Sequence, residues 1–125
     1  MYTPPANIPE AMQHYLRMWN ELDSELVRGH LDLAVAQDCQ WVDPQNAHTG
    51  RDALESNVHE FRKNFPTAVL RLASNVDGHN RRYRYEWQIT VDDELLIAGF
   101  DVSTLNEGGL IERVDGFFGQ LERLQ

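Results

Sequence analysis

The sequence has one cysteine, few basic residues and no long hydrophobic run. Because Cys39 has no second cysteine to pair with, an intramolecular disulfide is excluded, and nothing indicates an oxidising compartment. Lysine and arginine number 11, against 20 aspartate and glutamate residues, which gives a net charge of −9. Nucleic acids and anionic membranes bind basic surfaces, so we expect neither as a partner.

No stretch approaches the roughly 20 apolar residues of a membrane-spanning helix. Residues 1–7 contain two prolines and lack the basic and apolar regions of a signal peptide, so we expect an N-terminal arm and a cytoplasmic location. Of the 125 residues, 42% are hydrophobic, which is enough for a substantial core. We therefore expect a single domain over residues 1–125.

The first half of the chain has the hydrophobic periodicity of helices. Steps of three and four residues predict three helices, over residues 8–22, 24–38 and 51–64. The short turn between the first two is typical of a helical hairpin. Residues 39–43 are predicted to form a short strand that Pro44 ends, because proline cannot donate to a strand ladder. A polar loop is expected over residues 45–50.

After Pro66 the hydrophobic period changes to two. This pattern predicts four strands, over residues 68–76, 81–91, 94–105 and 110–121. Helices followed by consecutive strands are typical of the α+β class. We expect three N-terminal helices packed on a curved, mainly antiparallel sheet that encloses a pocket.

One carboxylate, Asp101, lies within the apolar stretch Ala98–Val102 of the third of these strands. If Asp101 faces inward, it is an acid in an apolar pocket, where desolvation raises the pKa of a carboxyl group. If Phe100 and Val102 face the core instead, alternation along the strand turns Asp101 toward water. Three cationic or titratable residues could pair with an inward carboxylate and keep it charged: His48, Arg51 and His59.

Five short segments and the order of the elements carry a family resemblance. The segments are Tyr15 with Trp19-Asn20-Glu21, Trp41-Val42-Asp43-Pro44, His48-Thr49-Gly50-Arg51, Ala98-Gly99-Phe100-Asp101 and Gly116-Phe117-Phe118-Gly119. From about residue 8 to 121 the chain resembles the nuclear transport factor 2-like (NTF2-like) superfamily, and within it the SnoaL-like branch. The resemblance implies a cone-shaped α+β fold. It implies no single function, because the superfamily includes isomerases, cyclases, epoxide hydrolases, dehydratases and transport factors.

The site pattern is similar to that of ketosteroid isomerase. Tyr15, Asp43 and Asp101 match that enzyme's tyrosine in helix 1, its aspartate before proline on the first strand and its aspartate in the penultimate strand. The resemblance implies that Asp43 is a general base, and that Tyr15 and a protonated Asp101 donate hydrogen bonds to the developing enolate oxygen. Val58 departs from the pattern, because the isomerase has a supporting tyrosine there.

Around these three residues we expect a pocket lined by Trp19, Trp41, His48, Val58, Phe61, Trp87, Val114 and Phe118. Each member of the site also has a simpler interpretation. Asp43 could end a strand and accept hydrogen bonds from loop amides, and Tyr15 could be a core residue with a satisfied hydroxyl. Trp87 could pack within the sheet or at a dimer face. No metal-ligand spacing is specific enough to predict a metal site, and no cofactor is expected.

Three functional hypotheses follow. The first is a cofactor-independent isomerase or polyketide cyclase-type enzyme that transfers protons on a small apolar carbonyl compound. In a variant of the epoxide hydrolase type, Asp101 or Asp43 activates a water, with an arginine as the orienting partner. The second is a non-catalytic module that binds a small apolar molecule in the same pocket. The third is an interaction protein that acts through its sheet face. A homodimer formed through the sheet is expected in addition.

Overall fold

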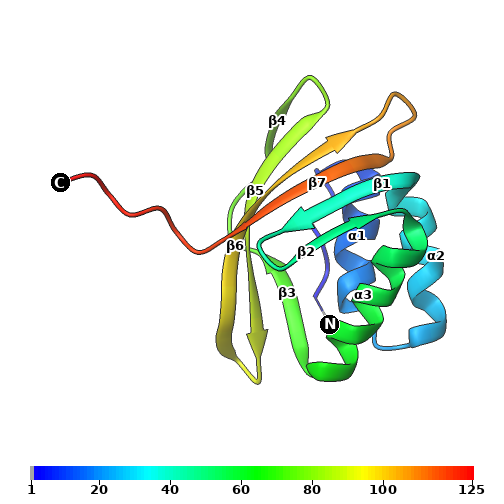
Figure 1. Cartoon of the computed structure of the whole chain (residues 1–125), viewed down its shortest axis with the longest axis horizontal. Coiled ribbons are helices and arrows are strands. Elements are labelled where there is room, and N and C mark those ends of the chain that lie inside the picture. The colour runs from blue at the N-terminus through cyan, green and yellow to red at the C-terminus, as the bar shows by residue number, and fades with distance from the viewer. Residues whose placement is uncertain (1) are drawn as a thin grey trace.

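The computed structural model describes residues 2–125 and confirms the expected α+β class. Helices α1 (Glu10–Asn20), α2 (Ser24–Ala34) and α3 (Arg51–Asn64) pack on one side of a curved sheet (Figure 1). The strands are β1 (Val35–Asp43), β2 (Asn46–Thr49), β3 (Ala68–Leu72), β4 (Asp77–His79), β5 (Arg82–Val91), β6 (Glu94–Leu105) and β7 (Ile111–Phe118). Their order is β2-β1-β7-β6-β5-β3, with β4 paired to β5. The β1–β7 pair is parallel and the other pairs are antiparallel, so the sheet is mixed.

The second helix ends four residues before the predicted boundary near Asp38. Val35 already has extended dihedral angles, φ −123° and ψ 150°, and it pairs with Ile111 of β7. The first strand therefore begins at Val35 rather than at residue 39. The apolar residues Ala34 and Val35 fit a helix and a buried strand equally well, and pairing with β7 decides between them.

The predicted loop over residues 45–50 is also wrong, because Asn46–Thr49 forms β2 and pairs with β1. The predicted strand over residues 68–76 ends at Leu72, and part of the turn expected after it is the short strand β4. The last strand ends at Phe118, and the segment after it extends away from the domain (Figure 1). The bounds predicted for α3 and β6 are confirmed.

Strand β6 presents Asp101 to the interior. Gly99, Asp101, Ser103 and Leu105 are buried, whereas the residues between them are half-buried. The alternative in which Asp101 faces water is therefore wrong. None of the helices within residues 2–125 is long and apolar enough to cross a membrane.

Candidate active site

A cavity of about 340 Å³ lies between the inner face of the sheet and the helices α1 and α3. Most of its wall is apolar and comes from α1, from α3 with its C-cap Phe65, and from the sheet: Trp19, Trp41, Val42, Phe61, Phe65, Leu70, Trp87, Ile89, Leu96, Ile97, Gly116 and Phe118. Six polar residues complete the lining: Tyr15, Asp43, Gln45, Asn46, Asn57 and Asp101. An apolar cavity with a few polar groups is the usual form of a small-molecule site.

The carboxyl group of Asp101 is held by two aromatic side chains of the neighbouring strand β5. Trp87 Nε1 donates to Asp101 Oδ1 at 2.8 Å, and the Tyr85 hydroxyl donates to Oδ2 at 3.3 Å. Ser103 lies 3.0 Å from the same hydroxyl, so Tyr85 has a second hydrogen-bond partner within the sheet. These contacts fix the orientation of the carboxyl group, and both partners are neutral.

Burial raises the pKa of Asp101 to about 7. The hydrogen bonds from Trp87 and Tyr85 lower that pKa, and the nearby charges of Asp43 and Asp115 raise it. Asp101 is therefore expected to gain and lose its proton near neutral pH rather than near pH 4. A group with such a pKa can donate or accept a proton at that pH.

None of the three candidates for a charged partner contacts Asp101. Arg51 donates to the carbonyl oxygen of Val35 at 2.7 and 3.0 Å, and His59 pairs with Glu55 at 3.0 Å. His48 stacks on Trp41 outside the cavity lining. The buried carboxyl group thus has no cationic partner among residues 2–125.

Tyr15 of α1 brings a second polar group to the cavity. Its hydroxyl oxygen accepts a hydrogen bond from Trp41 Nε1 at 2.8 Å, and its own proton has no acceptor within the described chain. Burial, followed by the charge of Asp101, raises the pKa of Tyr15 well above its usual value. The hydroxyl therefore stays protonated and can donate to a ligand. Trp41 therefore supports the Tyr15 hydroxyl, whereas the resemblance to ketosteroid isomerase implied a supporting tyrosine at the position of Val58.

Asp43, at the end of β1, accepts hydrogen bonds from the backbone N–H of Gln45 at 2.8 Å and from the side-chain amide of Asn46 at 3.1 and 3.3 Å. It therefore accepts the loop hydrogen bonds expected in the simpler interpretation, and it lines the cavity as well. Gly116 lies between the two carboxylates. A Cβ atom there would lie 2.9 Å from Asp101 Oδ1 and 3.3 Å from Asp43 Cβ.

A second glycine allows Trp87 to reach Asp101. Gly99 pairs with Trp87 across strands β6 and β5, and a Cβ atom at Gly99 would lie only 2.2 Å from the indole ring. The absent side chain leaves room for the indole to lie across β6. Its Nε1 atom can then approach Asp101 from the side.

Of the eight residues expected around the pocket, five line the cavity: Trp19, Trp41, Phe61, Trp87 and Phe118. Val58 and Val114 are buried in the core, and His48 lies behind Trp41, so these three are not part of its wall. The sequence interpretation missed Tyr85 and the polar residues Gln45, Asn46 and Asn57. The alternating pattern of residues 81–91 already placed Tyr85 on the face of Trp87, whereas no sequence signal distinguished the three amides.

No arginine is among the lining residues, although a water-activating site of the epoxide hydrolase type was expected to use one as an orienting partner. Within residues 2–125, no three histidine, cysteine, aspartate or glutamate side chains gather in a way that could hold a metal ion. The chemistry available at this site is therefore that of two carboxyl groups, one phenol and neutral hydrogen-bond donors.

The fold and this cavity define a cone-shaped α+β pocket protein, and solved structures of that class resemble it. A protein from Agrobacterium tumefaciens strain C58, described as a candidate isomerase of the SnoaL-like family, aligns with a TM-score of 0.82 and 32% identity. The alignment covers 88% of this chain and 95% of that chain. The chain therefore belongs to the SnoaL-like family, within the NTF2-like superfamily.

More distant structures share the fold alone. A candidate polyketide cyclase from Sinorhizobium meliloti aligns with a TM-score of 0.70 and 13% identity over 88% of this chain and 95% of that chain. A candidate SnoaL-like polyketide cyclase from Jannaschia sp. CCS1 aligns with a TM-score of 0.68 and 12% identity over 94% and 91%. No protein-family model and no curated protein matches the sequence.

Proposed function

We propose that this protein is a cofactor-independent enzyme that transfers protons on a small apolar carbonyl compound. One observation carries the proposal. A buried carboxyl group with a pKa of about 7 and no cationic partner in the described chain lines the same apolar cavity as a protonated tyrosine and a second carboxyl group. A carboxyl group with a purely structural role is rarely buried without a cationic partner, because such burial costs free energy.

The proposed roles follow the chemistry of enolisation. Asp43 removes a proton from the carbon next to the carbonyl group, and Tyr15 donates a hydrogen bond to the enolate oxygen that develops. Protonated Asp101 is the second donor to that oxygen. The name of the related Agrobacterium protein, an isomerase candidate, is consistent with this type of reaction.

Enolisation can be tested without knowledge of the natural substrate. In D2O, a protein that enolises the two-ring ketone 1-tetralone exchanges the protons next to its carbonyl group, which NMR measures directly. We expect the wild type to accelerate this exchange, and Asp43→Asn to slow it about 100-fold or more. Tyr15→Phe should slow it by a similar factor. Asp38→Asn is the matched control, since Asp38 is an exposed carboxylate of the same strand.

The pH profile of the exchange separates the roles of the two carboxyl groups. If protonated Asp101 is a donor, the rate falls as the pH rises above about 7, and this fall is absent in Asp101→Asn. A rate that instead rises through this range would make Asp101 the base. Exchange at the wild-type rate in Asp43→Asn would remove Asp43 from that role.

The apolar lining also supports the second hypothesis, a binding module without chemistry. The same experiment distinguishes it from the enzyme. Binding of 1-tetralone, seen by calorimetry, with no acceleration of proton exchange by the wild type would favour the module and contradict the proposed enzyme.

The outer face of the sheet supports the expected homodimer. Phe117 is 58% exposed and pairs with Phe100 across β7 and β6, on the face opposite to the cavity. We propose that two chains associate through this face. Phe117→Lys should then convert a dimer into a monomer in light scattering. Leu121→Lys should not, because Leu121 is also apolar and exposed but lies beyond the sheet. A wild type that is monomeric at micromolar concentration would contradict the proposal.

A further inference from the structure

Three polar side chains of the cavity form a hydrogen-bonded chain from α3 to β1. Asn57 of α3 donates through Nδ2 to Asn46 Oδ1 at 3.0 Å. Asn46 of β2 donates through its own Nδ2 to the two carboxylate oxygens of Asp43, at 3.1 and 3.3 Å. All three residues line the cavity, so the chain follows one edge of its wall.

The carboxylate at one end of this chain fixes the direction of every amide in it. An ionised carboxylate only accepts hydrogen bonds, so Asn46 must turn its Nδ2 toward Asp43 and its Oδ1 away. Asn57 must then turn its Nδ2 toward Asn46. His48 Nε2 lies 3.4 Å from the same Nδ2 and 3.3 Å from Asn46 Oδ1, so its tautomer decides whether it accepts from Asn57 or donates to Asn46.

This direction leaves Asn57 Oδ1 without a donor within residues 2–125. Asn57 is half-buried, and its oxygen retains contact with solvent or with the cavity space, because it is not among the buried atoms that lack a partner. An acceptor oriented by its neighbours and left free in a ligand-sized cavity is a recognition group for a ligand donor.

We propose that Asn57 Oδ1 accepts a hydrogen bond from a hydroxyl group of the substrate, which makes the substrate a hydroxylated cyclic ketone. This inference rests on the proton transfer proposed above, which requires the ketone. The cavity volume of about 340 Å³ corresponds to about eleven water molecules at ~30 Å³ each, which suits a ligand of one or two rings. The apolar wall, with Phe61, Phe65 and Leu96, matches the flat faces of such rings.

The proposal is tested with 1-tetralone and its derivatives with a hydroxyl group at ring position 5, 6 or 7. Binding is measured by calorimetry. One neutral hydrogen bond contributes about 0.5–1.5 kcal/mol, so we expect the wild type to bind at least one hydroxytetralone about 2- to 12-fold more tightly than 1-tetralone. Asn57→Ala and the bulkier Asn57→Leu should lose this preference.

Phe65→Leu is the control, since it alters the apolar wall and should weaken all four ketones by a similar factor. Equal affinities of the wild type for the four ketones would overturn the role of Asn57, and so would a preference that persists in both Asn57 variants. Either result leaves the proposed proton transfer standing if exchange of 1-tetralone is still accelerated. Failure of all four ketones to bind the wild type would overturn both proposals.

Discussion

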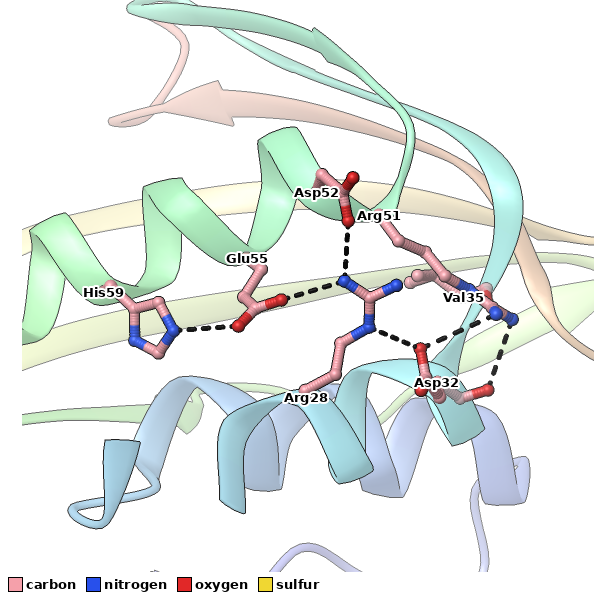
Figure 2. Close-up of polar contacts among 7 residues, drawn as sticks. All are labelled: Arg28, Asp32, Val35, Arg51, Asp52, Glu55 and His59. Carbon is pink, nitrogen blue, oxygen red and sulfur yellow. Dashed lines mark hydrogen bonds and ion pairs between the residues drawn. The ribbon is translucent and has the colours of Figure 1, made fainter. Parts of the chain in front are cut away.

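Two clusters of charged side chains in this protein differ in almost every physical respect. On the outside, Arg28 of α2 donates to Asp32, Asp52 and Glu55 at 2.8, 2.8 and 2.9 Å, and Glu55 also pairs with His59 (Figure 2). In the cavity, Asp101 is 8% exposed and its hydrogen-bond donors are both neutral. Charges on the surface are matched by opposite charges, whereas the buried carboxyl group is not.

The two clusters also respond to pH in opposite directions. Hydrogen bonds from Arg28, followed by His59, lower the pKa of Glu55, so its contribution to stability is lost as the pH falls below about 4.5. Burial raises the pKa of Asp101 from 3.8 to about 7. Across that window the unfolded chain releases the proton and the folded chain keeps it, so the free energy of unfolding falls as the pH rises. The surface cluster therefore stabilises the fold, whereas the cavity carboxyl group opposes folding increasingly as the pH rises from about 4 to about 7.

The largest expected effect comes from Asp101→Asn, which removes the buried charge and keeps an acceptor for Trp87. A pKa difference of about 3 units corresponds to about 4 kcal/mol, so the variant should be more stable than the wild type by up to this amount at pH 8. The difference in stability should shrink toward zero near pH 4, where Asp101 of the folded wild type is protonated and therefore neutral, like asparagine. Urea unfolding at the two pH values measures it.

Asp38→Asn, which replaces an exposed carboxylate, should show no such pH-dependent gain. If Asp101→Asn is no more stable than the wild type at pH 8, the ionised Asp101 carboxylate does not destabilise the fold, contrary to what its burial indicates.

The next largest effect is expected from Gly99→Ala, which breaks the support of Asp101 and leaves its charge. The added Cβ atom would lie 2.2 Å from the Trp87 indole and 2.5 Å from the carbonyl oxygen of Phe117, so the indole must move away from the carboxyl group. Overpacking of this kind costs about 1–3 kcal/mol. Urea unfolding measures the loss, and tryptophan fluorescence reports the movement.

Gly29→Ala provides the matched control. Gly29 is exposed within α2, and beyond its own helical turn no atom lies within 4 Å of the position that the added methyl group would take. The same substitution should stabilise the helix there by up to about 1 kcal/mol. Equal effects of the two substitutions would contradict a specific role of Gly99 beneath Trp87.

The inward direction of Asp101 depends on one residue that the sequence pattern does not reveal. The turn at Asp92-Asp93 pairs Val91 with Glu94, and uninterrupted pairing from there would place Asp101 opposite Arg84, on the outer face. The register shifts between Ile89 and Thr90, where the extra residue Leu96 forms a bulge on β6, so Asp101 lies opposite Tyr85 instead. Periodicity predicts the bounds of β6 because they follow from hydrophobicity and turn residues. It cannot predict the bulge, and therefore not the face.

Other parts of the site also divide into residues that the sequence pattern predicts and residues that it does not. Tyr15, Trp19 and Phe61 were predictable in the cavity because a helix repeats its faces every three to four residues, and the apolar stripes of α1 and α3 must face the sheet. Asn46 and Asn57 were not, since their positions depend on the pairing of β2 with β1 and on the packing of α3 beside it. Asn46 also lies in a predicted loop, where polar residues give no periodic signal.

The smallest effect is expected at the surface cluster, from Arg28→Met. Methionine retains the length and helix propensity of arginine but removes the charge that three carboxylates share. Arg28 is 40% exposed, so solvent screens these pairs, and we expect a loss of only about 1 kcal/mol at low salt. The loss should decrease in 1 M NaCl, where the screening length falls to about 3 Å.

Lys63→Met in α3, which removes an exposed cation with no ion pair in the described chain, should change stability by a few tenths of a kcal/mol at most. A salt-independent loss of several kcal/mol for Arg28→Met would place the surface cluster in the same energetic class as Asp101 and remove the contrast between them.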